Sequence, residues 1–125
     1  MLNPAPGFQT HPEHAIELAP ANQRIRVSFS GKTIAQTSNA IVLHESGYSP
    51  VFYIPMADIE KSLLTPGSRH SRCPFKGEAS YHGIAVGTEQ VDNAMWFYDD
   101  PYDEVVQIAG HAAFFPEKVD IDIED

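Results

Sequence analysis

The chain is poor in cysteine and in basic residues. Its single cysteine excludes an internal disulfide and a zinc site built from several cysteines. Eight lysines and arginines stand against 17 aspartates and glutamates, which leaves a formal net charge of -9. Such a charge repels phosphate backbones and anionic lipid surfaces. We therefore expect neither a nucleic-acid partner nor a membrane partner.

Long apolar runs are also absent. No stretch approaches the roughly 20 residues that a membrane-spanning helix needs. The N-terminus lacks the charged region and apolar core of a signal peptide. A lone cysteine suits a reducing compartment. These absences together predict a cytoplasmic protein.

The length and the apolar content of the chain predict one folded domain. The chain has 125 residues, of which 42% are hydrophobic and 10% aromatic, enough for a single core. Residues 1–22 contain four prolines and little periodicity: Pro4, Pro6, Pro12 and Pro20. We expect these residues to form an extended N-terminal arm and residues 23–125 to form the single domain.

Alternation of apolar and polar side chains predicts a mainly β fold. Ile25, Val27 and Phe29 alternate with polar residues, which is the period of a half-buried strand. A turn at 30–32 would return the chain through residues 33–36. Further strands are expected at residues 40–45, 51–54, 79–86, 91–98 and 119–124. Because the connections are short, we expect antiparallel pairing.

Two segments have a helical pattern. Residues 57–64 predict a short helical turn that ends before Pro66 and Gly67. Residues 102–115 carry apolar side chains at helical spacing and predict one C-terminal helix. The expected fold class is therefore mainly β with a small helical content (α+β).

Residues 73–77, with the sequence Cys-Pro-Phe-Lys-Gly, hold the densest group of chemically useful side chains. Cys73 is either a nucleophile activated by Lys76 and His70 or a residue without covalent chemistry, which ends a loop as a small buried side chain or lines a ligand pocket. Lys76 is either an anchor for an anion or the partner of Glu45 or Glu78 in a structural ion pair. The sequence leaves both alternatives open.

Four aromatic residues are candidates for a pocket wall. Trp96 and Tyr98 are two positions apart in a predicted strand, so they share a face, while Phe97 points to the other. Tyr53 and Tyr81 likewise combine a ring with a polar edge. These side chains suit either core packing or the binding of a flat or cationic ligand.

The histidines do not form a recognisable metal site. His44 and Glu45 are neighbours in a predicted strand and therefore point to opposite faces. Two pairs have the i,i+3 spacing of metal ligands, but neither has a recognisable second pair of ligands in the sequence: His11 with His14, and His70 with Cys73. We expect no metal and no cofactor.

Residues 73–77 belong to a longer series of short motifs. The others are Tyr-Ile-Pro at 53–55, Ala79 and Tyr81, Asn-Ala at 93–94 with Trp96 and Tyr98, Ile-Ala-Gly-His at 108–111, and Phe-Phe at 114–115. Between about residues 25 and 119, this series resembles the family catalogued as domain of unknown function 427 (DUF427), and Glu45 also fits. The resemblance implies a small, mainly β domain, similar to the β-tent arrangement of two antiparallel sheets, whose function is uncharacterised.

The family also carries a nucleotidyltransferase-like label. Polymerase-type nucleotidyltransferases place Gly-Ser at a helix start and, shortly afterwards, Asp-x-Asp on a strand that holds magnesium. In this chain Gly67 and Ser68 lie far upstream of Asp120 and Asp122. The spacing does not match, so the label receives little support from these residues.

The sequence therefore predicts a domain that binds a small anionic or aromatic ligand in a pocket between sheets. The expected binding residues are Glu45, Cys73, Lys76, Tyr81, Trp96 and Tyr98. One alternative is an enzyme in which Cys73 attacks a substrate, or in which Glu45 and His111 exchange protons. Another is an interaction module that pairs through an exposed strand edge, for example as a homodimer.

Overall fold

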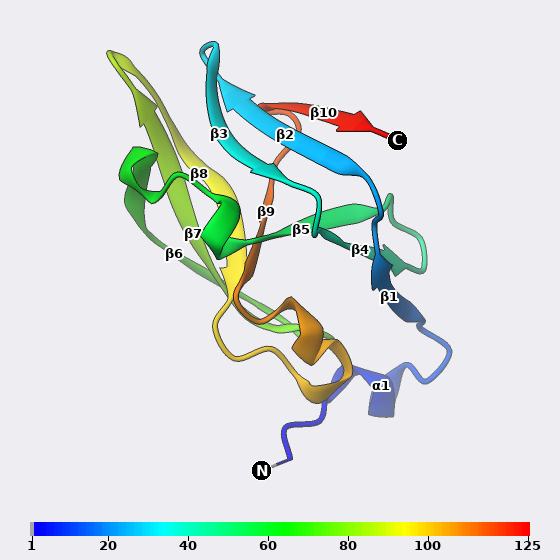
Figure 1. Cartoon of the computed structure of the whole chain (residues 1–125). Coiled ribbons are helices and arrows are strands. Elements are labelled where there is room, and N and C mark those ends of the chain that lie inside the picture. Colours follow the sequence, from blue (N-terminus) through cyan, green and yellow to red (C-terminus); the bar gives the residue numbers. More distant parts are fainter. Residues whose placement is uncertain (1) are drawn as a thin grey trace.

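Within residues 2–125, the protein has ten strands and very little helix (Figure 1). The computed structural model describes residues 2–125. All strand pairs are antiparallel, and the strands form one sheet of seven and one sheet of three. The predicted mainly β class with two antiparallel sheets is therefore confirmed.

The smaller sheet has the order β10-β2-β3. Its strands are β2 (Arg24–Phe29), β3 (Lys32–Thr37) and β10 (Asp120–Glu124). Ile25 and Val27 are fully buried, while the intervening Arg26 is exposed, as the alternating pattern predicts. The first hairpin and the last strand of the chain thus lie where the sequence places them.

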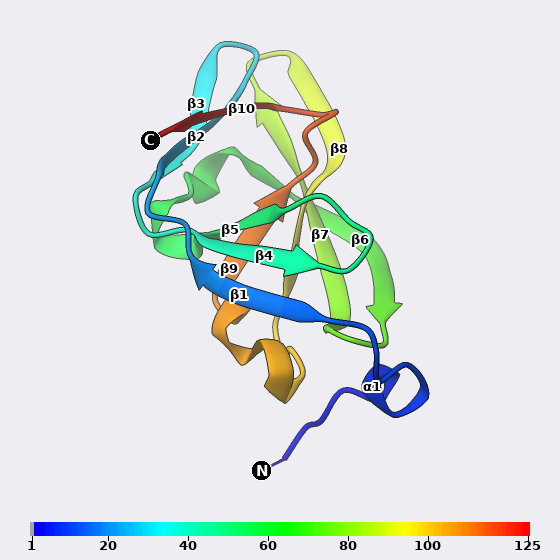
Figure 2. The same ribbon diagram turned by 90° about the vertical axis from the view of Figure 1, so that its right-hand side faces the viewer.

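The larger sheet has the order β1-β4-β5-β9-β8-β7-β6. Figures 1 and 2 show the long strands β6, β7 and β8 crossing the direction of β5, β4 and β1, so the sheet is strongly bent. Its strands are β1 (Ile16–Pro20), β4 (Ile41–Glu45), β5 (Val51–Pro55), β6 (Leu64–Cys73), β7 (Gly77–Val86), β8 (Glu89–Tyr98) and β9 (His111–Phe114).

The helices are all short. They are the α-helix α1 (Gly7–Thr10) and the 3₁₀ helices η1 (Met56–Asp58), η2 (Lys61–Leu63) and η3 (Asp103–Ile108). The helical turn predicted over residues 57–64 is present as η1 and η2. No helix within residues 2–125 has the length and the apolar character that crossing a membrane requires.

The predicted C-terminal helix over residues 102–115 is wrong. The chain forms only η3, which is kinked at Val105, and then turns at Gly110 with a φ of 75° before strand β9 begins. Strand β9 lies between β5 and β8, and its residues Ala112 and Phe114 are buried. A short strand buried on both faces has a continuous apolar run, which periodicity does not distinguish from a helix.

Strands β1 and β6 were not predicted. β1 lies within residues 1–22 and pairs with β4, and β6 includes the polar residues 68–72, which were expected only as a segment leading to Cys73. Both strands are edges of the larger sheet, and most of their side chains are exposed. Polar and proline-containing edge strands carry little apolar alternation, so their sequence signal is weak.

The core has two clusters of buried side chains. The first fills the space between the two sheets and includes Ile25, Ile54, Met95 and Phe114. The second packs on the larger sheet, beside η3. It contains Leu43, Tyr53, Ala79, Tyr81, Tyr98, Val105, Ile108 and Ala113. Three phenol groups therefore belong to this second cluster, which adjoins the turn between β6 and β7.

Candidate functional site

Residues 73–77 form the hairpin turn that joins β6 to β7. Cys73 pairs with Gly77 across the end of the hairpin. Gly77 has a φ of 125°, and a Cβ at this position would lie 3.3 Å from the Asp100 carbonyl oxygen. The Tyr102 N–H donates a hydrogen bond of 2.9 Å to the Lys76 carbonyl. Glycine thus allows a tight turn whose backbone is held by the segment after β8.

The N-terminal residues pack against the outside of this turn. The Gly7 N–H donates to the Pro74 carbonyl at 2.9 Å. The rings of His14 and Phe75 stack with their centroids 4.0 Å apart, and Phe8 meets Phe75 edge-on at 5.0 Å. The segment before β1 therefore helps to fix the turn and brings His14 beside it.

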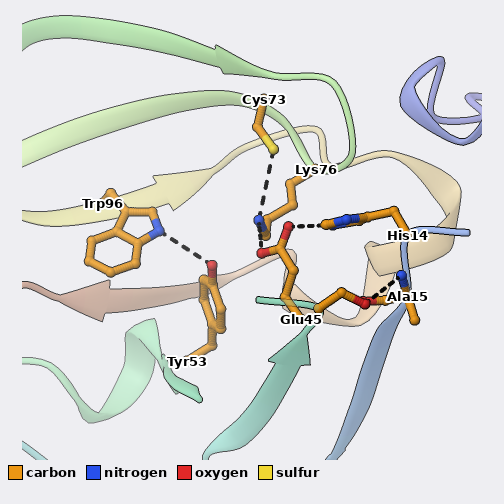
Figure 3. A network of polar contacts seen from close by, with 8 residues as sticks. His14, Ala15, Glu45, Tyr53, Cys73, Lys76 and Trp96 are labelled. Atoms are coloured by element: carbon orange, nitrogen blue, oxygen red, sulfur yellow. Dashed lines mark hydrogen bonds and ion pairs between the residues drawn. The ribbon is translucent and has the colours of Figure 1, made fainter. Parts of the chain in front are cut away.

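Lys76 forms an ion pair with Glu45, which extends to His14 (Figure 3). Lys76 Nζ donates to Glu45 Oε1 at 2.6 Å, and His14 Nε2 lies 2.8 Å from Glu45 Oε2. The Lys76 and Glu45 side chains are only 12% and 10% exposed. Glu78 contacts Arg72 instead, at 3.5 Å and in an exposed position. Of the two acidic partners predicted for Lys76, Glu45 is therefore the one that forms the ion pair.

The Lys76 ammonium group keeps hydrogen-bonding capacity beyond this pair. It has three N–H donors, of which one bonds to Glu45. The Cys73 Sγ atom lies 3.8 Å from Nζ, which is a weak contact, and Cys73 is half-buried. An acceptor atom on a ligand therefore has a donor available at this position.

Aromatic side chains surround the ion pair on the sheet side. The Trp96 Nε1–H donates to the Tyr53 hydroxyl oxygen at 3.3 Å, and the two rings meet edge-on. The Tyr81 hydroxyl shares a hydrogen bond of 2.6 Å with Ser71. Trp96 and Tyr98 face the same side of β8, as strand alternation predicts.

Two of these phenols have perturbed ionisation. Burial raises the pKa of Tyr53 above its ordinary value, although the hydrogen bond from Trp96 partly opposes this shift. Burial also raises the pKa of Tyr98, with a smaller contribution from the neighbouring Tyr53. Both hydroxyl groups therefore keep their protons at neutral pH and remain potential hydrogen-bond donors.

These side chains line one cleft of about 740 Å³, which we call the Lys76 cleft. All six predicted binding residues lie on it: Glu45, Cys73, Lys76, Tyr81, Trp96 and Tyr98. Six further lining residues were not predicted from the sequence: His14, Tyr48, Ser49, Val51, Pro74 and Phe75. Tyr53, a predicted pocket aromatic, also lines the cleft. The sequence suggests His14 only as a possible metal ligand with His11, because its approach to Glu45 depends on the pairing of β1 with β4.

His111 does not belong to the Lys76 cleft. It begins β9 and lines a separate groove with residues such as Asn39 and Gln107. Its Nδ1 atom lies 2.9 Å from the Ala109 carbonyl oxygen, to which the ring N–H donates. The structure therefore does not bring His111 together with Glu45 for a shared proton transfer.

The described residues also do not form the metal site or the nucleotidyltransferase site that the sequence analysis considered. Within residues 2–125, no three side chains of His, Cys, Asp or Glu are grouped in a way that would hold a metal ion. Gly67 and Ser68 lie inside strand β6, whereas Asp120 and Asp122 lie on β10 of the other sheet. The nucleotidyltransferase arrangement of a helix start beside an Asp-x-Asp strand is thus not formed by these residues.

The chain was compared with protein families and with curated proteins. A family model described as a domain of unknown function (DUF427) matches residues 17–125, which includes every strand except the first residue of β1. No curated protein matches the chain.

Proposed function

The chain belongs to the DUF427 family, and we propose that it binds a small aromatic acid in the Lys76 cleft. The observation that carries the proposal is that a nearly buried ammonium group and several aromatic rings with polar edges line one cleft. Ligand sites commonly combine a largely apolar wall with a few placed polar groups, in clefts of roughly 300–1,000 Å³.

The acidic group of the ligand would be recognised by Lys76. Glu45 holds the ammonium group in place and neutralises much of its charge, so recognition depends on direct hydrogen bonds rather than long-range attraction. The Tyr98 hydroxyl, which stays protonated, is a second donor on the same wall. A carboxylate accepts hydrogen bonds from both kinds of donor.

The ring of the ligand would pack against the aromatic wall. Trp96 and Tyr53 meet edge-on, and Trp96 also contacts Phe115 with ring centroids 4.5 Å apart. This arrangement holds the Trp96 indole in a fixed orientation along the cleft. A flat ring bound beside it gains both apolar burial and favourable ring contacts.

Tryptophan fluorescence tests the proposal because Trp96 is the only tryptophan in the chain. Titration with benzoate should change the Trp96 emission saturably. The Lys76→Met variant should bind benzoate about tenfold or more weakly, since it loses a charge-assisted hydrogen bond worth about 1.5–3 kcal/mol. Lys32→Met is the matched control, because Lys32 is exposed at the start of β3.

Equal benzoate affinity in Lys76→Met and the wild type would contradict the proposal. So would equal affinity for benzoate and benzamide, because the neutral amide lacks the charge that Lys76 would recognise. Circular dichroism of each variant establishes that the fold is retained.

A second candidate function is nucleophilic catalysis by Cys73. The specific observation that favours it is the position of the Lys76 ammonium group 3.8 Å from the sulfur, within the same cleft. A nearby cation stabilises a thiolate. Alkylation with iodoacetamide at graded pH measures this directly: an activated cysteine reacts fast near pH 7, whereas a structural one reacts only as the pH approaches about 8.5.

A further inference from the structure

An apolar groove adjoins the Lys76 cleft. It has a volume of about 390 Å³ and lies between the smaller sheet and strands β5 and β9. Ser49, Val51 and Trp96 line both the groove and the cleft. The two hollows therefore share a wall, and Trp96 stands at their junction.

The chemistry of the groove differs from that of the cleft. Ile121 and Ile123 of β10 line one side, and Phe52 and Phe114 line the other. Within the described residues 2–125, its lining has no charged side chain, and Ser49 is the only hydroxyl. Ile123 is 43% exposed, which is unusual for a large apolar side chain that faces a hollow. The groove is thus suited to an apolar group and not to a polar one.

Trp96 lines both the polar cleft and the apolar groove. Figure 3 shows Tyr53 between Trp96 and the pair formed by Lys76 and Glu45. The Trp96 Nε1–H donates toward Tyr53 and thus toward the polar side. The apolar groove adjoins the same indole. The charged end of a ligand and an apolar end therefore have separate places, and Trp96 lines both of them.

We propose that the natural ligand is amphiphilic, with an acidic head in the Lys76 cleft and an apolar tail that passes Trp96 into the groove. This inference rests on the proposed function and specifies the class of ligand. A ligand tail is the expected occupant of the groove because Ser49, Val51 and Trp96 line both hollows. A free apolar tail gains affinity from each methylene buried there.

A series of 4-alkylbenzoates tests the inference with the head group held constant. Affinity measured by Trp96 fluorescence should rise about fourfold for each methylene added from benzoate to 4-hexylbenzoate, until the groove is filled. Lys76→Met should weaken every member of the series by the same factor, since the head group is common to all.

Ile123→Asp removes the apolar mouth of the groove without touching the cleft. This variant should bind 4-hexylbenzoate about tenfold or more weakly than the wild type, with unchanged affinity for benzoate. Glu124→Gln is the matched control: Glu124 is exposed on the same strand and lies outside the groove. It should bind every member of the series as the wild type does.

Two results would overturn the inference while the proposed function stands: benzoate binding that depends on Lys76 with no gain from longer tails, or a gain that persists in Ile123→Asp. If no benzoate binds, the proposed function itself fails. Light scattering at the same concentrations identifies a different occupant of the groove. A wild-type dimer that becomes a monomer in Ile123→Asp would mean that a second copy covers the groove, and this would also overturn the inference.

Discussion

The ion pair between Lys76 and Glu45 determines what the cleft is able to bind. Both side chains are withdrawn from water, so each charge needs its partner to offset the loss of hydration. His14 occupies the second oxygen of Glu45. The carboxylate is therefore committed within the protein, and the ammonium group retains the donors that face a ligand.

The Glu45→Gln substitution tests the energetic role of this pair. It keeps the shape of the side chain but leaves the Lys76 charge without a compensating carboxylate at 12% exposure. We expect the free energy of unfolding to fall by about 3 kcal/mol, because breaking a buried pair leaves an uncompensated charge. Urea denaturation followed by Trp96 fluorescence measures this loss.

Glu78→Gln provides the control at a solvent-exposed position. Its partner Arg72 is 3.5 Å away, and both side chains are more than half exposed. Exposed pairs contribute less than about 1 kcal/mol. Equal losses in the two variants would show that burial does not strengthen the Lys76 pair.

The sequence predicted the members of the cleft better than their contacts. Cys73, Lys76, Trp96 and Tyr98 were found because they lie in dense motifs or alternate along a strand. For the ion pair of Lys76, the sequence offers two acidic partners, at residues 45 and 78, and does not distinguish between them. The choice depends on pairs that are far apart along the chain, and local patterns do not contain that information.

The strands β6, β7 and β8 form the frame of the site. Gly83 lies in the central strand of the three, where the register shifts against β8. A Cβ there would lie 2.5 Å from Thr65 Oγ1 of β6 and 2.6 Å from the Val91 carbonyl oxygen of β8. Glycine is thus required because both neighbouring strands approach its backbone closely.

The Gly83→Ala substitution should therefore separate these strands locally. We expect it to lower the free energy of unfolding by about 1–3 kcal/mol, as overpacking does in a close-packed interior. Glu89→Ala, at the exposed start of β8, is the control and should change stability by less than about 0.5 kcal/mol. Urea denaturation measures the free energy of unfolding of both variants. A Gly83→Ala variant as stable as the control would show that the strands move apart without a loss of stability.

Elements with one buried face were predicted well, and the others were not. The alternation of Ile25 and Val27 with polar residues marks β2, and its partner β3 follows from the intervening turn. Strand β9 is buried between two neighbours and resembles a helix in its sequence, whereas β1 and β6 are exposed edges with little apolar content. Periodicity is informative only where one face meets the core and the other meets water.

The site exists only when the chain is folded. Glu45 lies 31 residues from both His14 and Lys76, and Tyr53 lies 43 residues from Trp96. The cleft also shares Tyr53, Tyr81 and Tyr98 with the second core cluster. The stability of the fold and the geometry of the cleft therefore depend on the same side chains.

The buried phenol of Tyr98 predicts a loss of stability in alkaline solution. Burial raises its pKa in the folded protein above the value near 10 of the unfolded chain. The contribution of Tyr98 to stability is fully present below pH 10 and is lost as the pH rises further, because the unfolded state releases the proton first. Above pH 10 this loss approaches about 1.4 kcal/mol per pH unit.

The Tyr98→Phe variant should therefore lose stability less steeply than the wild type between pH 10 and 11. Tyr48→Phe is the matched control, because Tyr48 is 70% exposed and should leave the slope unchanged. Urea denaturation at each pH provides the slopes. Identical slopes in wild type and Tyr98→Phe would mean that this phenol ionises equally in both states.

A nuclear magnetic resonance titration with benzoate tests directly whether the Lys76 cleft binds an aromatic acid. Trp96 provides the only indole N–H signal of the chain, and that N–H donates to Tyr53 at the wall of the Lys76 cleft. We predict a saturable shift of this signal together with the backbone amides of Glu45 and residues 73–77. Shifts confined to other parts of the molecule, or none at millimolar benzoate, would contradict the account.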